Sequence, residues 1–491
     1  MKALVVGTGL GGLATALQLA HQGWEVEMVE KHSTAGGRLN RLERNGFVFD
    51  VGPSFFSMSY EFRSFFEKLE LPLPFSIEPL DPLYAVFFDH RPEPLLIWRD
   101  RNKLTNSFAA IEPDFSRKLN DFLHTSRQIF EDTEWRIVKR NFDSIADYLK
   151  ALSSVPLKHL PKLLCSMWTH LERHFESEEA KAVFSLVSFF LGAPPFRTPA
   201  VYALLNYVEL QHDGYWNVRG GMYRIVEAMV DLLQQKGVAL HFDREIVAAE
   251  AHNGRLQALV DHQGHRWSAD VFVINGDAAA FRGLVFKRHR YRQQTLDRMQ
   301  WTLAPFTMYL GVRGRIQVLQ QHNYFLGTDF RNYAKRLFQN RQLPAQPYYY
   351  VNVSSKNNPD CAPPNCENLF VLCPVPDLRY KSDWSDAQQF ADLILDDLSR
   401  RCDFPIRKQL LTCTVYTPKD WEQQFNLYRG SGLGLGHGLM QVGALRPANY
   451  DEQLKNVFYV GASTVPGTGL PMVLISSQLV LQRIESYARS L

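Results

Sequence analysis

The sequence lacks the features that mark several common protein classes. Its 491 residues contain only six cysteines, scattered without the dense and even spacing of a disulfide framework. Cys361 and Cys366 have no second Cys or His pair at zinc-site spacing, so we expect reduced thiols and no metal site. Lys and Arg total 54 against 51 Asp and Glu, a net charge of +3, which gives no basis for predicting a nucleic acid partner.

Signal-peptide and membrane-span patterns are also missing. The apolar strand expected at residues 3–6 runs directly into Gly7 and leaves no room for the regions of a signal peptide. Residues 456–482 carry no charge and are long enough to cross a bilayer, but Pro466 and Pro471 interrupt them. The sequence therefore predicts no transmembrane segment.

The N-terminal residues show an alternation of strand and helix. An apolar strand at residues 3–6, a glycine loop at 7–12, a helix at 13–22 and a strand at 26–30 form a βαβ unit with parallel strands. The loop carries Gly7, Gly9 and Gly12 in the G-x-G-x-x-G pattern that brings a helix N-terminus close to a pyrophosphate. Glu30 ends the second strand, where a carboxylate accepts hydrogen bonds from the adenosine ribose. These features predict a dinucleotide-binding α/β domain.

Later glycines favour FAD over NAD. Gly36 and Gly37 precede Arg38, a combination suited to close approach and charge-assisted hydrogen bonds to a second phosphate or a flavin edge. Near the C-terminus, Gly461 and the segment 466–472 place backbone donors at the start of the last predicted helix, residues 471–487. We therefore expect both ends of the chain to hold one FAD molecule.

Together these motifs resemble the bacterial carotenoid desaturases of the phytoene desaturase type, over the whole chain. The resemblance rests on these segments: Gly7 to Gly12, Glu30-Lys31, Gly36 to Arg38, Asp50 to Pro53, Phe189 to Gly192, Gly220 to Met222, Phe370 to Pro376, Arg446-Pro447 and Val460 to Pro471. It implies an amine-oxidase-like flavoprotein fold, FAD as the redox cofactor and a long polyene substrate. The residues that we expect to bind FAD are Gly7, Gly9, Gly11, Gly12, Glu30, Lys31, Gly37, Arg38, Pro53, Ser54, Val247, Asn275, Gly461, Gly469, Pro471 and Met472.

The predicted architecture is a Rossmann-like FAD-binding domain with a mixed-sheet substrate domain and a helical, membrane-associated insertion. We expect the FAD-binding domain at residues 1–70, 215–300 and 440–491, where the βαβ alternation and the glycine loops lie. The substrate domain is expected at residues 71–113 and 301–439, which are rich in strand patterns. The helical insertion is expected at residues 114–214.

Aromatic residues make up 13% of the chain and suggest a large apolar surface for a hydrocarbon substrate. The predicted substrate-tunnel residues are Phe184, Phe189, Phe190, Phe196 and Trp216. Residues 155–175 combine leucines at helical spacing with Lys158, His159, Lys162 and His170, a mixture suited to a bilayer surface. A buried amphipathic helix is the alternative for this stretch.

The predicted function is FAD-dependent desaturation of a carotenoid by hydride transfer to flavin, on the inner face of the cell membrane. The substrate is either of the phytoene type or a 1-hydroxycarotenoid, and oxygen and a quinone are both open as electron acceptors. No catalytic base is assigned, since His322 and His437 are expected at the surface or in the core. A carotenoid isomerase or saturase and a non-catalytic lipid or prenyl chaperone are the alternatives. An amine oxidase ranks lower, because Ala462 follows Gly461 where related flavoenzymes have an acid.

Overall fold

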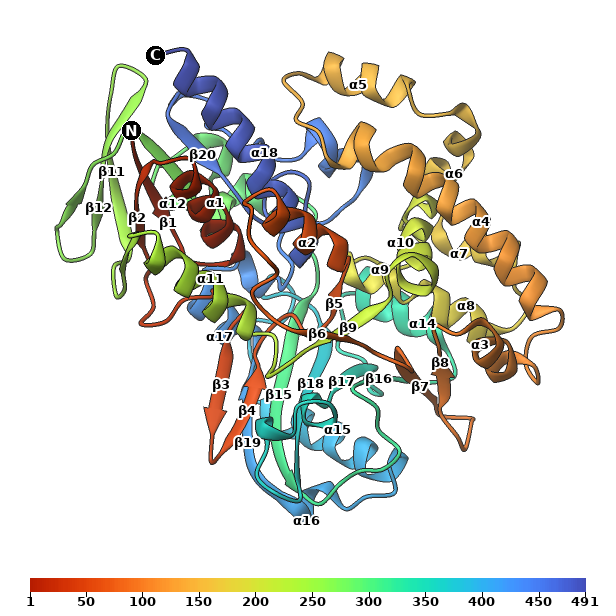
Figure 1. Ribbon diagram of the computed structural model, residues 1–491. Coiled ribbons are helices and arrows are strands. Elements are labelled where there is room, and N and C mark those ends of the chain that lie inside the picture. Colours follow the sequence, from red (N-terminus) through yellow and green to blue (C-terminus); the bar gives the residue numbers. More distant parts are fainter.

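The computed structural model describes residues 1–491, apart from the side chain of Phe190. A five-stranded parallel sheet forms the centre of the first body of the molecule, and both ends of the chain lie in this body (Figure 1). Its strands, in spatial order, are β10 (Ala239–His241), β2 (Glu25–Val29), β1 (Lys2–Val6), β14 (Val271–Ile274) and β20 (Val457–Tyr459). The predicted βαβ start is present, with β1 and β2 parallel and joined by helix α1 (Leu10–His21).

Both faces of the parallel sheet are covered by other elements, because the side chains of β1 point alternately to the two faces and are apolar on each. Ala3 and Val5 pack against the helices α1, α11 (Arg224–Gln235) and α18 (Leu470–Arg489). Leu4 and Val6 face the other way, toward helix α12 (Ala278–Leu284) and a three-stranded antiparallel sheet. The strands of that sheet are β11 (Ile246–His252), β12 (Arg255–Asp261) and β13 (Arg266–Trp267).

A seven-stranded mixed sheet forms the second body, in the lower part of Figure 1. Its strands, in spatial order, are β19 (Leu410–Tyr416), β15 (Ala304–Arg313), β18 (Cys366–Val375), β17 (Tyr349–Asn352), β16 (His322–Leu326), β7 (Tyr84–Phe88) and β8 (Leu95–Ile97). Only β16 and β7 pair in parallel. Helix α15 (Ala387–Arg401) packs on one face through Phe390 and Ile394, and the aromatic opposite face belongs to the core that reaches the helical region.

Small elements join these two sheets. The hairpin of β3 (Arg41–Arg44) and β4 (Phe47–Asp50) packs against β18. A three-stranded sheet follows, with the order β5 (Phe56–Ser57), β9 (Tyr215–Val218) and β6 (Ile77–Pro79). The remaining helices of this part are α2 (Ser59–Glu67), α13 (Gln293–Leu296), α16 (Ile406–Gln409) and α17 (Pro418–Phe425).

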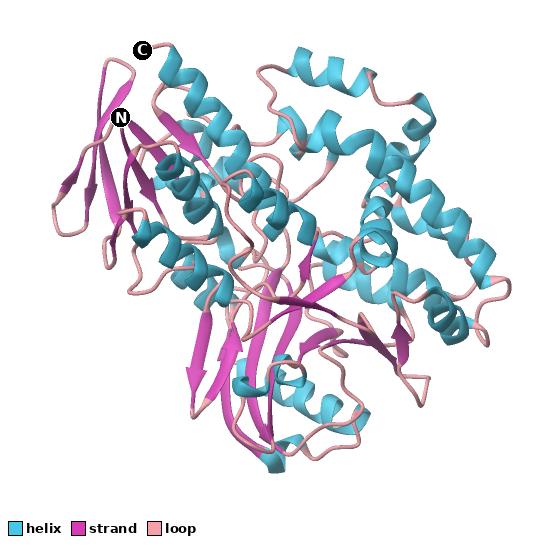
Figure 2. Ribbon diagram, viewed as in Figure 1, coloured by secondary structure: helices cyan, strands magenta, loops and turns pink.

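Helices form the third body, on the right of Figure 2. They are α3 (Arg101–Phe108), α4 (Phe115–Thr133), α5 (Ile145–Ser153), α6 (Leu160–Leu164), α7 (Met167–Glu172), α8 (Glu178–Ser185), α9 (Val187–Phe190), α10 (Leu204–Tyr207) and α14 (Phe330–Ala334). Stacked phenylalanines bind them together, with Phe108 and Phe115 ring centroids 4.2 Å apart. None of the helices in the described part of the chain combines the length and apolar character of a membrane-crossing helix.

The predicted single amphipathic face of residues 155–175 is wrong. Cys165 adopts an extended conformation and the Ser166 side chain caps the next helix by accepting the Thr169 N–H at 3.1 Å, so the chain turns between α6 and α7. As a result Leu164 is 78% exposed, whereas Met167 is fully buried. His159 and His170 are buried as well, so the two histidines are not surface cations of this stretch.

Candidate active site

One cavity of about 930 Å³ runs through the centre of the molecule, between the parallel sheet, the mixed sheet and the helices. Fifteen of the sixteen residues predicted to bind FAD line it. They are Gly7, Gly9, Gly11, Glu30, Lys31, Gly37, Arg38, Pro53, Ser54, Val247, Asn275, Gly461, Gly469, Pro471 and Met472. Segments separated by more than 400 residues therefore share one wall, as the sequence motifs predict for a cofactor held by both chain ends.

Gly12, the sixteenth predicted residue, does not line the cavity. A Cβ atom at this position would lie 2.1 Å from the carbonyl oxygen of Gly7. Gly12 is thus required for close packing of α1 on the end of β1, the role expected of the third glycine in the motif.

Asn275 explains why several other glycines are needed here. This side chain at the end of β14 lies between the two glycine loops and donates from Nδ2 to the Val460 carbonyl oxygen at 3.2 Å. A Cβ at Gly9 or Gly11 would come within 2.7 or 2.8 Å of its amide atoms, and one at Gly461 within 2.9 Å. Asn275 therefore sets the spacing between the N-terminal and C-terminal loops of the site.

Glu30 joins the second strand to the glycine loop. Its carboxylate is 5% exposed, and Oε2 accepts both the N–H and the hydroxyl proton of Thr8 at 2.8 Å. Oε1 accepts the N–H of His32 at 3.0 Å. Oε2 thus uses both of its lone pairs, whereas Oε1 keeps one for a hydroxyl group of a ribose. The next residue, Lys31, is tied to α17 by donating to the Asn426 side-chain oxygen at 3.1 Å.

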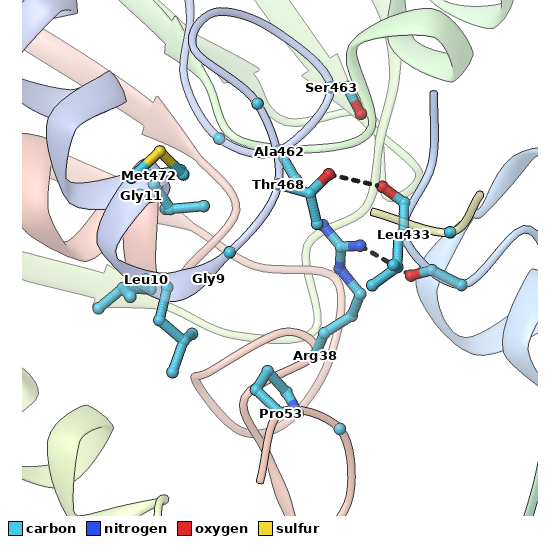
Figure 3. A pocket seen from close by; sticks show the side chains of 18 of the residues that line it. Gly9, Leu10, Gly11, Arg38, Pro53, Leu433, Ala462, Ser463, Thr468 and Met472 are labelled. Carbon is cyan, nitrogen blue, oxygen red and sulfur yellow. Dashed lines mark hydrogen bonds between the residues drawn. The ribbon is translucent and has the colours of Figure 1, made fainter. Parts of the chain in front are cut away.

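Arg38 is a buried cation that faces the cavity. It reaches past Pro53 toward the loop that carries Leu433, and Nη1 donates to the Gly432 carbonyl oxygen at 3.0 Å (Figure 3). Burial lowers the pKa of its guanidinium, and none of the described carboxylates forms an ion pair with it. Its charge is therefore available for the pyrophosphate or flavin of a bound FAD, so the residues present fit this cofactor.

Arg446 holds the C-terminal loop in place, a role that its sequence motif did not reveal. The side chain is buried and donates five hydrogen bonds to backbone carbonyl oxygens, including Ala462 at 2.7 Å and Thr464 at 2.9 Å. Thr468 extends the same frame by donating from its hydroxyl to the Leu433 carbonyl at 3.0 Å (Figure 3). The backbone donors before α18 are consequently fixed around the cavity before any ligand binds.

The apolar half of the cavity differs from the predicted tunnel. Phe189 lines it, whereas Phe184, Phe196 and Trp216 do not. Phe184 is fully buried among the stacked phenylalanines, Phe196 packs on Trp168 at 4.8 Å, and Trp216 donates to the Asp213 carboxylate at 3.2 Å. The Phe190 prediction lies outside the described side chains. The aromatic residues correctly indicated that this part of the chain contributes to an apolar cavity. Whether a given ring lies in the core or in the cavity wall depends on the segments that pack against it.

Three short π-helical segments contribute to the cavity wall. They are η1 (Glu134–Val138), η4 (Val208–His212) and η6 (Lys335–Gln339), and each supplies at least one lining residue. Such insertions are rare and concentrate at functional sites, because the extra residue redirects side chains that a regular helix would place elsewhere. No sequence pattern used above indicates them.

A hydrogen-bonded chain of side chains links the cofactor side of the cavity to the mixed sheet. Ser54 and Tyr350 share a hydrogen bond at 2.9 Å, and the Tyr350 oxygen lies 2.6 Å from Nδ1 of His322. Burial lowers the pKa of His322 to about 3, which keeps the imidazole neutral. His437, 3.2 Å from the Thr468 N–H, has its pKa lowered to about 3 for the same reason.

Comparison with known proteins agrees with this arrangement. The model of the family "flavin containing amine oxidoreductase" matches residues 10–484. A zeta-carotene-forming phytoene desaturase of Myxococcus xanthus is 32% identical over 100% of this chain and 95% of its own, and a carotenoid 3,4-desaturase of Haloarcula japonica is 30% identical over 96% of each. Among solved structures, an oxidoreductase from Methanosarcina mazei has a TM-score of 0.64 at 16% identity, covering 98% of this chain and 100% of that one. The predicted FAD cofactor and amine-oxidase-like fold are thereby confirmed, and the chain belongs to the flavin-containing amine oxidoreductase family.

Proposed function

We propose that this protein is an FAD-dependent carotenoid desaturase. The observation that carries the proposal is the single cavity in which two glycine loops and a buried arginine meet a wall of aliphatic and aromatic side chains. A purely apolar substrate has no polar group that could form a hydrogen bond or an ion pair, so an enzyme that oxidises it must align it by shape along such a wall. The relatives named as carotenoid desaturases, similar over the full chain, support this substrate class.

In this proposal the protein binds, aligns and excludes water. When bound, FAD would supply the two-electron oxidation by accepting a hydride from one carbon of the chain, while the adjacent carbon would release a proton to a base or to an atom of the cofactor as the C=C bond forms. Arg38 and the α1 N-terminus hold its negative charge, Glu30 accepts the ribose hydroxyls, and the loop fixed by Arg446 supplies backbone donors. Phe189 and the π-helical segments line the substrate path. Oxygen or a quinone would serve as the final electron acceptor.

The decisive experiment is an anaerobic incubation of the FAD-loaded protein with liposomes that contain phytoene or a 1-hydroxycarotenoid. Flavin bleaching together with a polyene absorbing at longer wavelength is the expected result. Formation of geometric isomers of the carotenoid without bleaching of the flavin would identify an isomerase. Loss of double bonds from the carotenoid when the enzyme has been chemically reduced would identify a saturase. Failure of the protein to bind FAD at all would favour the chaperone and refute the desaturase.

We further propose that the helical body rests on the inner face of the cell membrane. Large apolar side chains are exposed on and beside α5 and α6. This apolar patch consists of Trp135, Ile145, Leu149, Leu157, Leu160 and Leu164. Lys150 and Lys158 lie among them, and the neighbouring segment η1 lines the cavity. Apolar anchors interspersed with cations suit an anionic lipid surface and would deliver a lipid-dissolved substrate to the cavity.

Vesicle sedimentation tests the membrane proposal. The double variant Leu157→Glu/Leu164→Glu should lose at least about 10-fold in partitioning onto vesicles of phosphatidylcholine and phosphatidylglycerol, because two exposed anchors become charges. Leu393→Glu is the control, since Leu393 is also an exposed leucine, at 51% against 80% for Leu157 and 78% for Leu164, but lies on α15 of the mixed-sheet body. Equal binding by the two variants would show that the apolar patch does not contact lipid.

A further inference from the structure

A carboxyl group lies in the apolar part of the cavity and is not used by the proposed mechanism. Glu209 belongs to the π-helical segment η4, is 4% exposed and lines the cavity. Its surroundings are aromatic, with Tyr215 and Tyr324 on the same wall and Tyr84 behind them. Burying a carboxyl group in such a place costs several kcal/mol unless its oxygens are satisfied.

The hydrogen bonds of Glu209 are incomplete. Oε2 accepts the Tyr215 hydroxyl at 3.1 Å, and the Tyr84 hydroxyl also bonds to this carboxyl group. Oε1 is buried and has no partner in the described structure. No described cation compensates its charge, and burial raises the pKa of the carboxyl to about 7. Glu209 can therefore either accept or donate one more hydrogen bond near neutral pH.

Tyr324 provides a second open position beside it. Its ring lines the cavity and lies 5.4 Å from that of Tyr84, and its phenol is close enough to Glu209 for an electrostatic interaction. Its hydroxyl makes no hydrogen bond within the described part of the chain. An alcohol on a ligand is the group that can satisfy both residues, because a hydroxyl is at once a donor and an acceptor.

The position of this cluster relates it to the cofactor side of the cavity. The Tyr215 ring lies 4.7 Å from the ring of Phe55, which directly follows Pro53 and Ser54, the residues expected beside FAD. A hydrocarbon chain held by an oxygen at this cluster would have its oxygen-bearing end, rather than its middle, near the cofactor. The cluster would thus select both the substrate and the bond that is oxidised.

Resting on the proposed function, we infer that Glu209, Tyr215 and Tyr324 form a hydroxyl-binding subsite, and that the substrate is a polyene that carries an alcohol near one end. A plain hydrocarbon would leave the Glu209 Oε1 atom buried and unpaired in the complex. The alcohol removes this penalty, which gives the hydroxylated polyene its advantage. Discrimination of this kind is strong when a buried polar group is left unpaired by the wrong substrate.

The test compares two probes of equal chain length, a polyene with a tertiary alcohol at one end and the corresponding hydrocarbon. Binding to FAD-loaded protein in detergent is followed by quenching of tryptophan fluorescence, and turnover by flavin bleaching. Glu209→Leu should lower affinity and kcat/KM for the alcohol by roughly 10-fold to 100-fold and leave those for the hydrocarbon within about twofold. Tyr215→Phe should show the same selectivity with a smaller effect, and Glu209→Gln, which keeps a donor and an acceptor, should retain most of the preference.

The two probes separate the failure of this inference from that of the proposed function. If the wild type binds and oxidises both probes equally, or if Glu209→Leu weakens both to the same extent, the subsite does not exist. If neither probe is oxidised but the alcohol binds more tightly and Glu209→Leu abolishes the difference, the subsite stands and the desaturase proposal falls. The FAD absorbance and thermal midpoint of each variant verify folding, and Tyr215→Phe carries the test if Glu209→Leu does not fold.

Discussion

Replacing Glu30 by glutamine tests how the protein prepares its dinucleotide site. The carboxylate accepts three hydrogen bonds within the protein, two from Thr8 and one from the N–H of His32. Glutamine has a single side-chain oxygen and an NH₂ group in place of the other. If the oxygen stays with Thr8, the NH₂ group faces the His32 N–H across the 3.0 Å now spanned by a hydrogen bond.

The expected cost follows from that geometry. A hydrogen bond to a charged group contributes about 1.5–3 kcal/mol, and a donor left facing a donor inside the protein forfeits at least one. Spread over a domain of roughly 200 residues, a loss of about 2 kcal/mol lowers the thermal midpoint by about 4–8 °C. The ribose hydroxyls of FAD also lose a charged acceptor, so we expect roughly 10-fold to 100-fold weaker FAD binding.

Thermal unfolding of FAD-free protein and fluorescence titration with FAD measure the two effects separately. Glu27→Gln is the control, because Glu27 lies on the same strand and its surface ion pair with Lys2, at 3.0 Å, contributes at most about 1 kcal/mol. It should melt within about 3 °C of the wild type and bind FAD equally well. If Glu30→Gln behaves like this control in both measurements, the carboxylate neither orders the loop nor contacts the cofactor.

Three further substitutions probe the glycine loop, the buried arginine and a buried carboxyl group. Gly12→Ala should yield protein with little bound FAD, because the new Cβ would lie 2.1 Å from a backbone oxygen. The ratio of flavin absorbance to protein absorbance measures the bound FAD, and a full complement of FAD would contradict this prediction. Arg38→Met should weaken FAD binding at least about 10-fold, because the buried guanidinium has no ionic partner within the protein. The thermal midpoint of the FAD-free protein should change by less than about 3 °C. A large drop in that midpoint would show that Arg38 has a structural role instead. Burial raises the pKa of Asp50 to about 7, so the folded state retains a proton that the unfolded state loses near pH 4, and stability falls as the pH rises from about 4 to 7. Asp50→Asn should therefore gain on the wild type between pH 5 and pH 8 in denaturant titrations, by up to about 4 kcal/mol, and parallel pH profiles would refute the assignment.

Much of the cofactor site was predictable because its signals are local. Gly7, Gly9 and Gly12 lie close together between a strand and a helix, and the positive φ of Gly7 and the lack of space for a Cβ at Gly9 and Gly12 leave few alternatives to glycine. The strand and helix periods then place that loop at the carboxyl end of a strand in a parallel sheet. All but one of the predicted cofactor residues line the cavity. The start of α1 at Leu10 rather than residue 13 is a small difference, since the glycines themselves enter the first turn.

The substrate side could not be predicted residue by residue. Leu164 and Met167 are both apolar, but a turn at Cys165 and Ser166 exposes the first and buries the second. Phe184 and Phe189 are five residues apart, and only the second reaches the cavity. Periodicity identifies an apolar face, whereas the choice between core, cavity and solvent depends on which distant segment packs against it.

The sequence alone thus determined the βαβ start, the paired glycine loops, FAD and the family, because these depend on spacing within a few residues or on motifs at the two chain ends. Only the tertiary structure revealed Asn275 between the loops, the five carbonyls bound by Arg446 and the unpaired oxygen of Glu209. Each of these depends on contacts between segments far apart in the chain. Such contacts are set by the packing of the whole fold, and no local pattern records them.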